Sequence, residues 1–119
     1  MSRRLSFRIW DHLNNEWKGT RAVIGNSKSL EDQTEDYCSI IQFTGLFDFN
    51  GKEIWEGDLL HCDVPSPRSL ERVYFKDGSF KAAGMWILGR LLEHGKSNKF
   101  KISVKGNIFE NPELEGKYV

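Results

Sequence analysis

The chain has 119 residues, of which 39% are hydrophobic and 13% aromatic, and its 17 basic and 17 acidic residues balance formally. This length suits one compact unit or two very small ones, and the aromatic content with only three prolines argues against a disordered chain. No apolar run is long enough to cross a bilayer, and no signal-peptide core follows the first residues. We therefore expect a cytoplasmic protein without a membrane anchor.

Residues 1–36 are predicted to form an N-terminal β segment followed by a polar linker. Leu5, Phe7 and Ile9 alternate with polar residues, and the break at Asn14-Asn15 predicts a hairpin. Residues 27–36 are polar, with signals for at most one helical turn, and fit a linker or lid. Residues 37–119 form the second region, and one compact unit spanning both is the alternative.

The segment 43–58 carries the strongest turn signals of the chain. Asn50-Gly51 is a dipeptide that accepts positive φ at both central positions of a two-residue hairpin turn. Gly57 and Asp58 then predict a second turn that leads into a strand over residues 59–64. The sequence thus predicts a hairpin followed directly by another strand.

Three blocks of the chain, Phe7–Asp11, Tyr37–Asp58 and Gly106–Leu114, resemble the YopX family of phage and prophage proteins. The blocks occur in the family's order and span nearly the whole chain. The resemblance implies an all-β fold with SH3-like barrels of short antiparallel strands, a phage or prophage origin, and no assigned molecular activity. It marks a structural signature consisting of Gly45, Asn50, Gly51, Gly57, Asp58, Gly106 and Asn107.

Most of the remaining sequence also favours strands. Pro65-Ser66-Pro67 predicts a loop, and Asp77-Gly78 is a second two-residue hairpin signal. Met85–Glu93 fits a short helix and a buried strand almost equally well. Apart from this one ambiguous segment, the signals predict short strands joined by turns. Such a succession of short strands is typical of a barrel or sandwich.

The carboxy-terminal part continues the β pattern. Phe100, Ile102 and Val104 alternate with polar residues and are predicted to face inward. The Asn111-Pro112 turn is predicted to start one final helical turn.

The sequence gives no catalytic, metal or cofactor motif. His12, His61 and His94 have no spacing that favours a metal, and Cys38 and Cys62 are predicted to be free, buried thiols, with a disulfide between them as the alternative. There is no phosphate-binding glycine loop, nucleophile elbow or paired cysteine motif. We therefore expect a protein that binds a partner and neither catalyses a reaction nor holds a cofactor.

Charge is segregated along the chain despite the neutral total. Residues 1–30 sum to +4, residues 31–64 to −8, residues 65–105 to +6, and the remainder to −2. Folding can mix these segments into a neutral surface, or it can leave a bipolar surface suited to a homo-oligomer. For the oligomer we expect an interface around the predicted hairpin, formed by Phe47, Phe49, Glu53 and Trp55.

Nucleic-acid binding is the alternative function that the sequence suggests. Basic and aromatic residues interleave in the second half, where cations neutralise phosphates and aromatic rings stack on bases. The candidate contacts are Arg72, Tyr74, Lys76, Trp86, Lys99 and Lys101. The sequence pI of about 6.8 is unusually low for such a role, so a host or phage protein is the preferred partner class.

Overall fold

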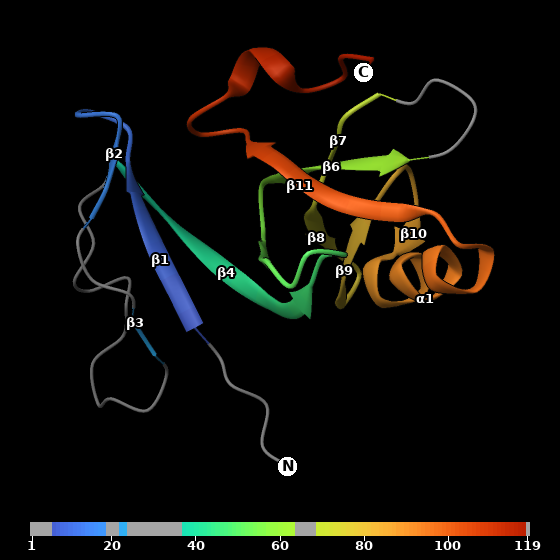
Figure 1. Cartoon of the computed structure of the whole chain (residues 1–119). Coiled ribbons are helices and arrows are strands. Elements are labelled where there is room, and N and C mark those ends of the chain that lie inside the picture. The colour runs from blue at the N-terminus through green and yellow to red at the C-terminus, as the bar shows by residue number, and fades with distance from the viewer. Residues whose placement is uncertain (1–5, 19–21, 24–36, 64–68, 119) are drawn as a thin grey trace.

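The computed structural model describes residues 6–18, 22–23, 37–63 and 69–118. Figure 1 shows antiparallel strands that curl into a partial barrel, one helix, and a sheet that extends from the barrel toward the N-terminal end. The elements are β1 (Ser6–Asp11), β2 (Glu16–Trp17), β3 (Ala22–Val23), β4 (Cys38–Phe47), β5 (Glu53–Trp55), β6 (Asp58–Asp63), β7 (Glu71–Arg72), β8 (Tyr74–Lys76), β9 (Ser79–Ala82), β10 (Trp86–Ile87), α1 (Leu88–Asn98), β11 (Lys101–Asn107) and the 3-10 helix η2 (Pro112–Leu114). The prediction of an all-β fold is confirmed.

Strand β1 organises the N-terminal sheet. It pairs antiparallel with β2, β3 and β4, and the hairpin predicted from Asn14-Asn15 forms with Asn15 at a φ of 54°. The Asp11 carboxylate accepts hydrogen bonds from the backbone amides of Leu13 and Asn14 and so closes this turn. The predicted polar linker 27–36 and the Pro65–Pro67 loop lie outside the described residues.

Strand β4 links the N-terminal sheet to the barrel. Its first half pairs with β1 and its second half with β5, and the register shifts between Phe43 and Leu46. Gly45 has a φ of 83° at this bulge, and the Thr44 hydroxyl donates to the Ile54 carbonyl at 2.6 Å. A bulge increases local twist, so β4 turns from one sheet into the other here.

The β4–β5 hairpin forms as predicted, but the predicted turn type is wrong. Gly51 has a φ of 79°, whereas Asn50 is not among the residues with positive φ. The Gly51 amide donates to the Asp48 carbonyl at 3.0 Å, and the Asp48 amide donates to the Lys52 carbonyl at 2.8 Å. This is a three-residue hairpin, in which a turn is followed by a glycine bulge. The Asp48 side chain selects it by accepting the amides of Asn50 and Lys52.

The second hairpin, between β8 and β9, has the two-residue turn that its sequence predicts. Asp77 and Gly78 both have positive φ, at 51° and 82°. The ambiguous segment 85–93 divides between two structures, because Trp86 and Ile87 pair with β9 and the chain then enters α1, which continues to Asn98. The predicted final helical turn is η2.

The main core lies between α1 and the curled strands. Its buried side chains include Ile54, Leu60, Val73, Leu88 and Ile102. Phe100 and Val104 are half-buried and pack against this cluster, in agreement with the predicted inward face of β11. A smaller core of Ile41, Phe43 and Trp55, with Trp17 and Phe109 packed against it, lies where the N-terminal sheet meets the barrel.

Candidate functional site

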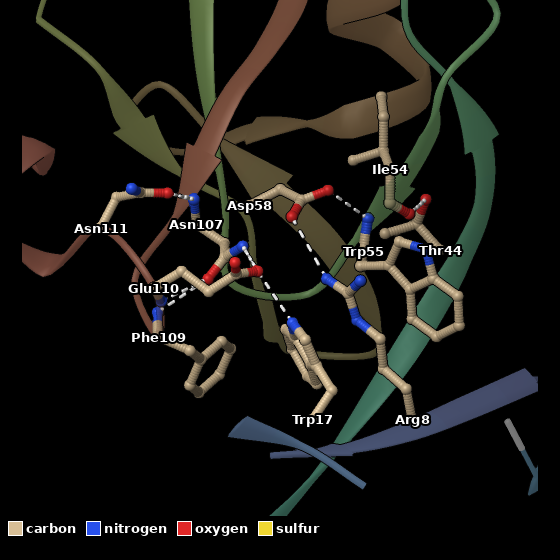
Figure 2. A network of polar contacts seen from close by, with 10 residues as sticks. All are labelled: Arg8, Trp17, Thr44, Ile54, Trp55, Asp58, Asn107, Phe109, Glu110 and Asn111. Carbon is tan, nitrogen blue, oxygen red and sulfur yellow. Dashed lines mark hydrogen bonds and ion pairs between the residues drawn. The ribbon is translucent and has the colours of Figure 1, made fainter. Parts of the chain in front are cut away.

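The N-terminal sheet is joined to the barrel by a polar junction network, which comprises Arg8, Trp17, Asp58, Asn107 and Glu110 (Figure 2). The Arg8 guanidinium carbon lies 3.9 Å from the ring centre of Trp17 and 4.6 Å from that of Trp55. Its Nη2 atom lies 3.6 Å from Asp58 Oδ1. An arginine from β1 is therefore enclosed by two indole rings and directed at a carboxylate of β6.

The signature residues build the other side of this junction. Asp58 Oδ2 accepts the Trp55 amide at 2.8 Å, and Asn107 Oδ1 accepts the amides of Phe109 and Glu110. A side chain at Gly106 would meet Asn111 Oδ1 at 2.7 Å. These residues set the backbone path of the β5–β6 turn and of the segment after β11.

The two carboxyl groups of the network have opposite pKa shifts. Burial raises the pKa of Asp58 to about 6, against the lowering effects of the Trp55 amide and Arg8. The Trp17 indole, which donates to Glu110 Oε1 at 2.8 Å, and the Asn107 amide hold the pKa of Glu110 below its usual value. Acid–base pairs in enzymes show such divergence, but here burial accounts for the raised pKa of Asp58 and hydrogen bonds account for the lowered pKa of Glu110.

A cleft of about 270 Å³ adjoins the network and is also lined by Lys52 and Glu53. Within the described residues, no group of three or more His, Cys, Asp or Glu side chains is arranged to hold a metal ion. Cys38 and Cys62 form no disulfide with each other, and both are half-buried rather than buried as predicted. His12 donates to or accepts from the Ser39 hydroxyl at 2.6 Å. The junction network therefore fastens two sheets together.

A second concave surface, which we call the hairpin-tip pocket, lies between the β4–β5 turn, α1 and β11. Its volume is about 400 Å³, and its walls are mainly apolar. The apolar residues are Phe47, Phe49, Leu92, Gly95, Phe100 and Ile102, and the charged ones are Asp48, Lys96, Lys99 and Lys101. Asp48 directs Oδ1 at the turn amides and Oδ2 at the Val104 amide, so its carboxylate is engaged within the fold.

The predicted interface aromatics separate into two groups. Phe47 and Phe49 are 50% and 58% exposed, and Lys101 Nζ lies 4.9 Å from the Phe49 ring centre. Trp55 is only 6% exposed because it packs on Phe43 with ring centres 5.4 Å apart, so its prediction as an exposed interface residue is wrong. Glu53 pairs opposite Phe47 but lines the junction cleft.

The acidic surface predicted around the hairpin is smaller than the sequence count implies. Asp48 and Asp58 are buried, and their oxygens bind backbone amides or Arg8. Glu53 and Glu56 are half-buried, while Asp63 is exposed. The acids Glu31, Asp32, Glu35 and Asp36 lie outside the described residues, so most of the remaining negative charge of residues 31–64 belongs to the stretch 31–36.

The candidate nucleic-acid contacts are only partly brought together. Lys99 and Lys101 flank the hairpin-tip pocket, and Trp86 connects to it through a ring series in which His94 contacts Trp86 at a tilt and Phe100 edge-on. The other three candidates lie on β7 and β8. There Arg72 pairs with Glu115 at 2.8 Å, the Tyr74 hydroxyl donates to the Gly84 carbonyl, and Lys76 is exposed.

Arg8, Asp48, Lys96 and Glu110 were missed from the sequence as site residues. The spacing of Asp48 before Asn50-Gly51 is a usable signal, because aspartate side chains commonly bind amides two residues ahead. Lys96 lies in the last turn of α1, whereas Lys99 is the left-handed residue that ends the helix, so no helical spacing in the sequence links the two lysines. Arg8 and Glu110 have no local signal, because their partners are distant in sequence.

Comparison with known proteins identifies a family and a fold. The YopX protein family model matches residues 6–114. The chain is similar to protein EF1440 from Enterococcus faecalis, whose crystal structure superimposes on it with a TM-score of 0.64. The two sequences are 29% identical, and the matched region covers 92% of this chain and 96% of the other. No curated protein sequence matches the chain. No helix among the described residues is long and apolar enough to cross a membrane.

Proposed function

The chain belongs to the YopX family, and we propose that it is a self-assembling protein-interaction module whose contact surface is the hairpin-tip pocket. The proposal is for binding rather than catalysis. We further propose that it is an accessory protein encoded by a phage or prophage, acting in the cytoplasm of the bacterial host on its own copies and on a host or phage protein. The resemblance to phage proteins supports this origin.

The observation that carries the proposal is the combination of exposed aromatics with a preformed pocket. Phe47 and Phe49 are about half exposed although they border a pocket floored by Leu92, Phe100 and Ile102. Large aromatic side chains in well-packed pockets contribute most of the binding energy at protein interfaces. The three lysines at the rim add charge, which favours fast and selective encounter more than affinity.

Sedimentation velocity at micromolar concentration tests the proposal. We expect the wild-type chain to form a discrete oligomer and Phe49→Ser to dissociate it, because the substitution removes the apolar centre of the contact. Phe75→Ser is the matched control, since Phe75 is similarly exposed but lies on β8, outside the hairpin-tip pocket. A monomeric wild-type chain at both low and moderate salt defeats the proposal. So does an oligomer that Phe49→Ser leaves intact.

Nucleic-acid binding is the second candidate, because Lys96, Lys99 and Lys101 surround an exposed Phe49. Fluorescence anisotropy with labelled single-stranded DNA and RNA tests it. If it holds, affinity falls steeply with added salt, and changing Lys99 and Lys101 to Ala makes the logarithmic slope shallower by about 1.4. Absence of binding at low salt removes this candidate.

A further inference from the structure

The chemistry of the hairpin-tip pocket specifies the kind of segment that it can bind. The pocket offers an apolar floor and three ammonium groups, while its one carboxylate, Asp48, is engaged by backbone amides. A complementary segment needs one large apolar side chain with several carboxylates beside it and no basic residue. Charges of opposite sign at the rim then set its register.

One stretch of this chain has that composition. Leu30-Glu31-Asp32-Gln33-Thr34-Glu35-Asp36 contains a leucine and four acids without a lysine or arginine. Several of the acids elsewhere are engaged within the fold. Asp48 and Asp58 are buried, Glu110 accepts Trp17 and Asn107, and Glu115 pairs with Arg72.

The pocket of its own copy is hard for this stretch to reach. The stretch ends next to Tyr37, one residue before β4 begins, whereas the pocket is lined by Phe47, where β4 ends. The 10 residues of β4 span at most about 30 Å at the usual rise per residue. Leu30 is seven residues before Tyr37 and can lie at most about 25 Å from it, and each acid is nearer still. Only a fully extended stretch that runs back along β4 would approach the pocket of its own copy, so a second copy is the favoured source of the occupant.

We infer that the acidic stretch 30–36 of one copy occupies the hairpin-tip pocket of a second copy, with Leu30 against the apolar floor and the carboxylates near Lys96, Lys99 and Lys101. This rests on the proposed self-assembly and names its contact. Because two different surfaces meet, the contact is heterologous, and each copy both offers a stretch and receives one. Such a contact closes into a ring when the rotation between copies permits and otherwise extends as a filament.

Two complementary full-length variants test this contact. The first is the stretch variant, in which Glu31→Gln, Asp32→Asn, Glu35→Gln and Asp36→Asn are combined, so that it keeps an intact pocket but a neutral stretch. The second is the pocket variant, Phe49→Ser, which keeps an intact stretch. We expect each variant alone to be monomeric by sedimentation velocity. An equimolar mixture should form a 1:1 dimer, because one intact stretch can then meet one intact pocket. Circular dichroism confirms that both variants are folded.

The remaining outcomes separate the two proposals. If the stretch variant assembles like the wild type while Phe49→Ser is monomeric, the self-assembly surface stands and the acidic stretch is not its occupant. If both variants assemble like the wild type, or the wild type is monomeric, the proposed function fails as well. If both variants are monomeric and the mixture stays monomeric, the stretch and the pocket do not bind each other, and the inference is overturned.

A labelled peptide of residues 29–37 adds a direct measurement, with the stretch variant as receptor because its pocket is not filled by another copy. We expect binding to weaken at least tenfold when Lys96, Lys99 and Lys101 are changed to Gln in that receptor. The matched control is Lys105→Gln, since Lys105 is also exposed on β11 but lies outside the pocket. Equal peptide binding by both receptors overturns the inference. Binding of single-stranded nucleic acid at Phe49 without any binding of the peptide also overturns it.

Discussion

Gly57 allows the closest approach at the junction between the N-terminal sheet and the barrel. It has a φ of 88°, and a Cβ atom there would lie 2.6 Å from Phe109 Cε2. The Phe109 ring cannot easily move, because it packs against Trp10 and Trp17 with ring centres 5.9 and 5.7 Å away. A side chain at this position therefore has two separate costs. The first is the strain of a positive φ, and the second is the clash with the Phe109 ring.

Comparison of two glycine substitutions separates these costs. Gly78 has a φ of 82°, but a Cβ atom there would meet no other atom within 4 Å, so Gly78→Ala reports the backbone cost alone, about 1 to 2 kcal/mol. We expect Gly57→Ala to lower the free energy of unfolding by at least about 1 kcal/mol more, from overpacking. Urea unfolding followed by tryptophan fluorescence measures both. Equal losses would show that the Phe109 contact has no energetic effect.

The raised pKa of Asp58 predicts that this residue weakens the fold as the pH increases. The unfolded carboxyl has a pKa of 3.8 and the folded one about 6, so its neutral form favours folding. The contribution is fully present below about pH 4 and is lost as the pH rises through 6. Two pKa units correspond to at most about 3 kcal/mol.

Asp58→Asn isolates this effect, because the amide oxygen can still accept the Trp55 amide while the group no longer titrates. From pH 4.5 to pH 8 we expect the variant to gain stability relative to the wild type by about 2 kcal/mol. Taking the difference between the two proteins cancels the other titrating groups. A difference that stays constant across this range contradicts the burial argument.

At the scale of elements, the β4–β5 hairpin forms one wall of the hairpin-tip pocket and is held to β11. The Phe49 amide donates to the Ile102 carbonyl at 2.8 Å, and Asp48 Oδ2 accepts the Val104 amide at 2.9 Å. Gly51 closes the turn with its φ of 79°. The shape of the pocket wall therefore depends on the turn as well as on the exposed aromatics.

Gly51→Val should destabilise the protein much more than Lys52→Ala. A β-branched side chain resists positive φ, so we expect a loss of at least about 1 to 2 kcal/mol for valine. Lys52→Ala removes an exposed charge and should stay within about 0.5 kcal/mol. Thermal unfolding at neutral pH compares the two. If Lys52→Ala costs as much as Gly51→Val, the turn conformation is not what holds the hairpin.

Local sequence signals predicted the elements better than the contacts between them. Alternation located β1 and β11, and Asp77-Gly78 correctly predicted the two-residue turn between β8 and β9. Asn50-Gly51 misled because the Asp48 side chain selects a longer turn than the dipeptide favours alone. Arg8 lies within the block Phe7–Asp11, but nothing in that block indicated its position between two indole rings, because this position depends on pairing between strands far apart in sequence.

At the scale of the whole molecule, the described chain is elongated, with principal extents of 46 × 37 × 26 Å. Strand β4 runs from β2 at one end toward α1 at the other (Figure 1). The acidic stretch precedes β4, and the lysine-lined pocket lies at its far end. An acidic sequence directly before β4 and a lysine-lined pocket at the far end of the strand favour head-to-tail association over a symmetric pairing of identical surfaces.

Amide chemical shifts of the isotope-labelled chain, recorded in a dilution series, locate the contact between copies. We predict concentration-dependent shifts at Phe47 and Phe49 and along residues 96–101, which border the hairpin-tip pocket. A second exposed apolar group at Phe75, Met85 and Ile87 provides the internal comparison and should change little. Shifts confined to that second group, or no shifts over the concentration range in which the oligomer forms, would contradict the assignment of the hairpin-tip pocket as the interface.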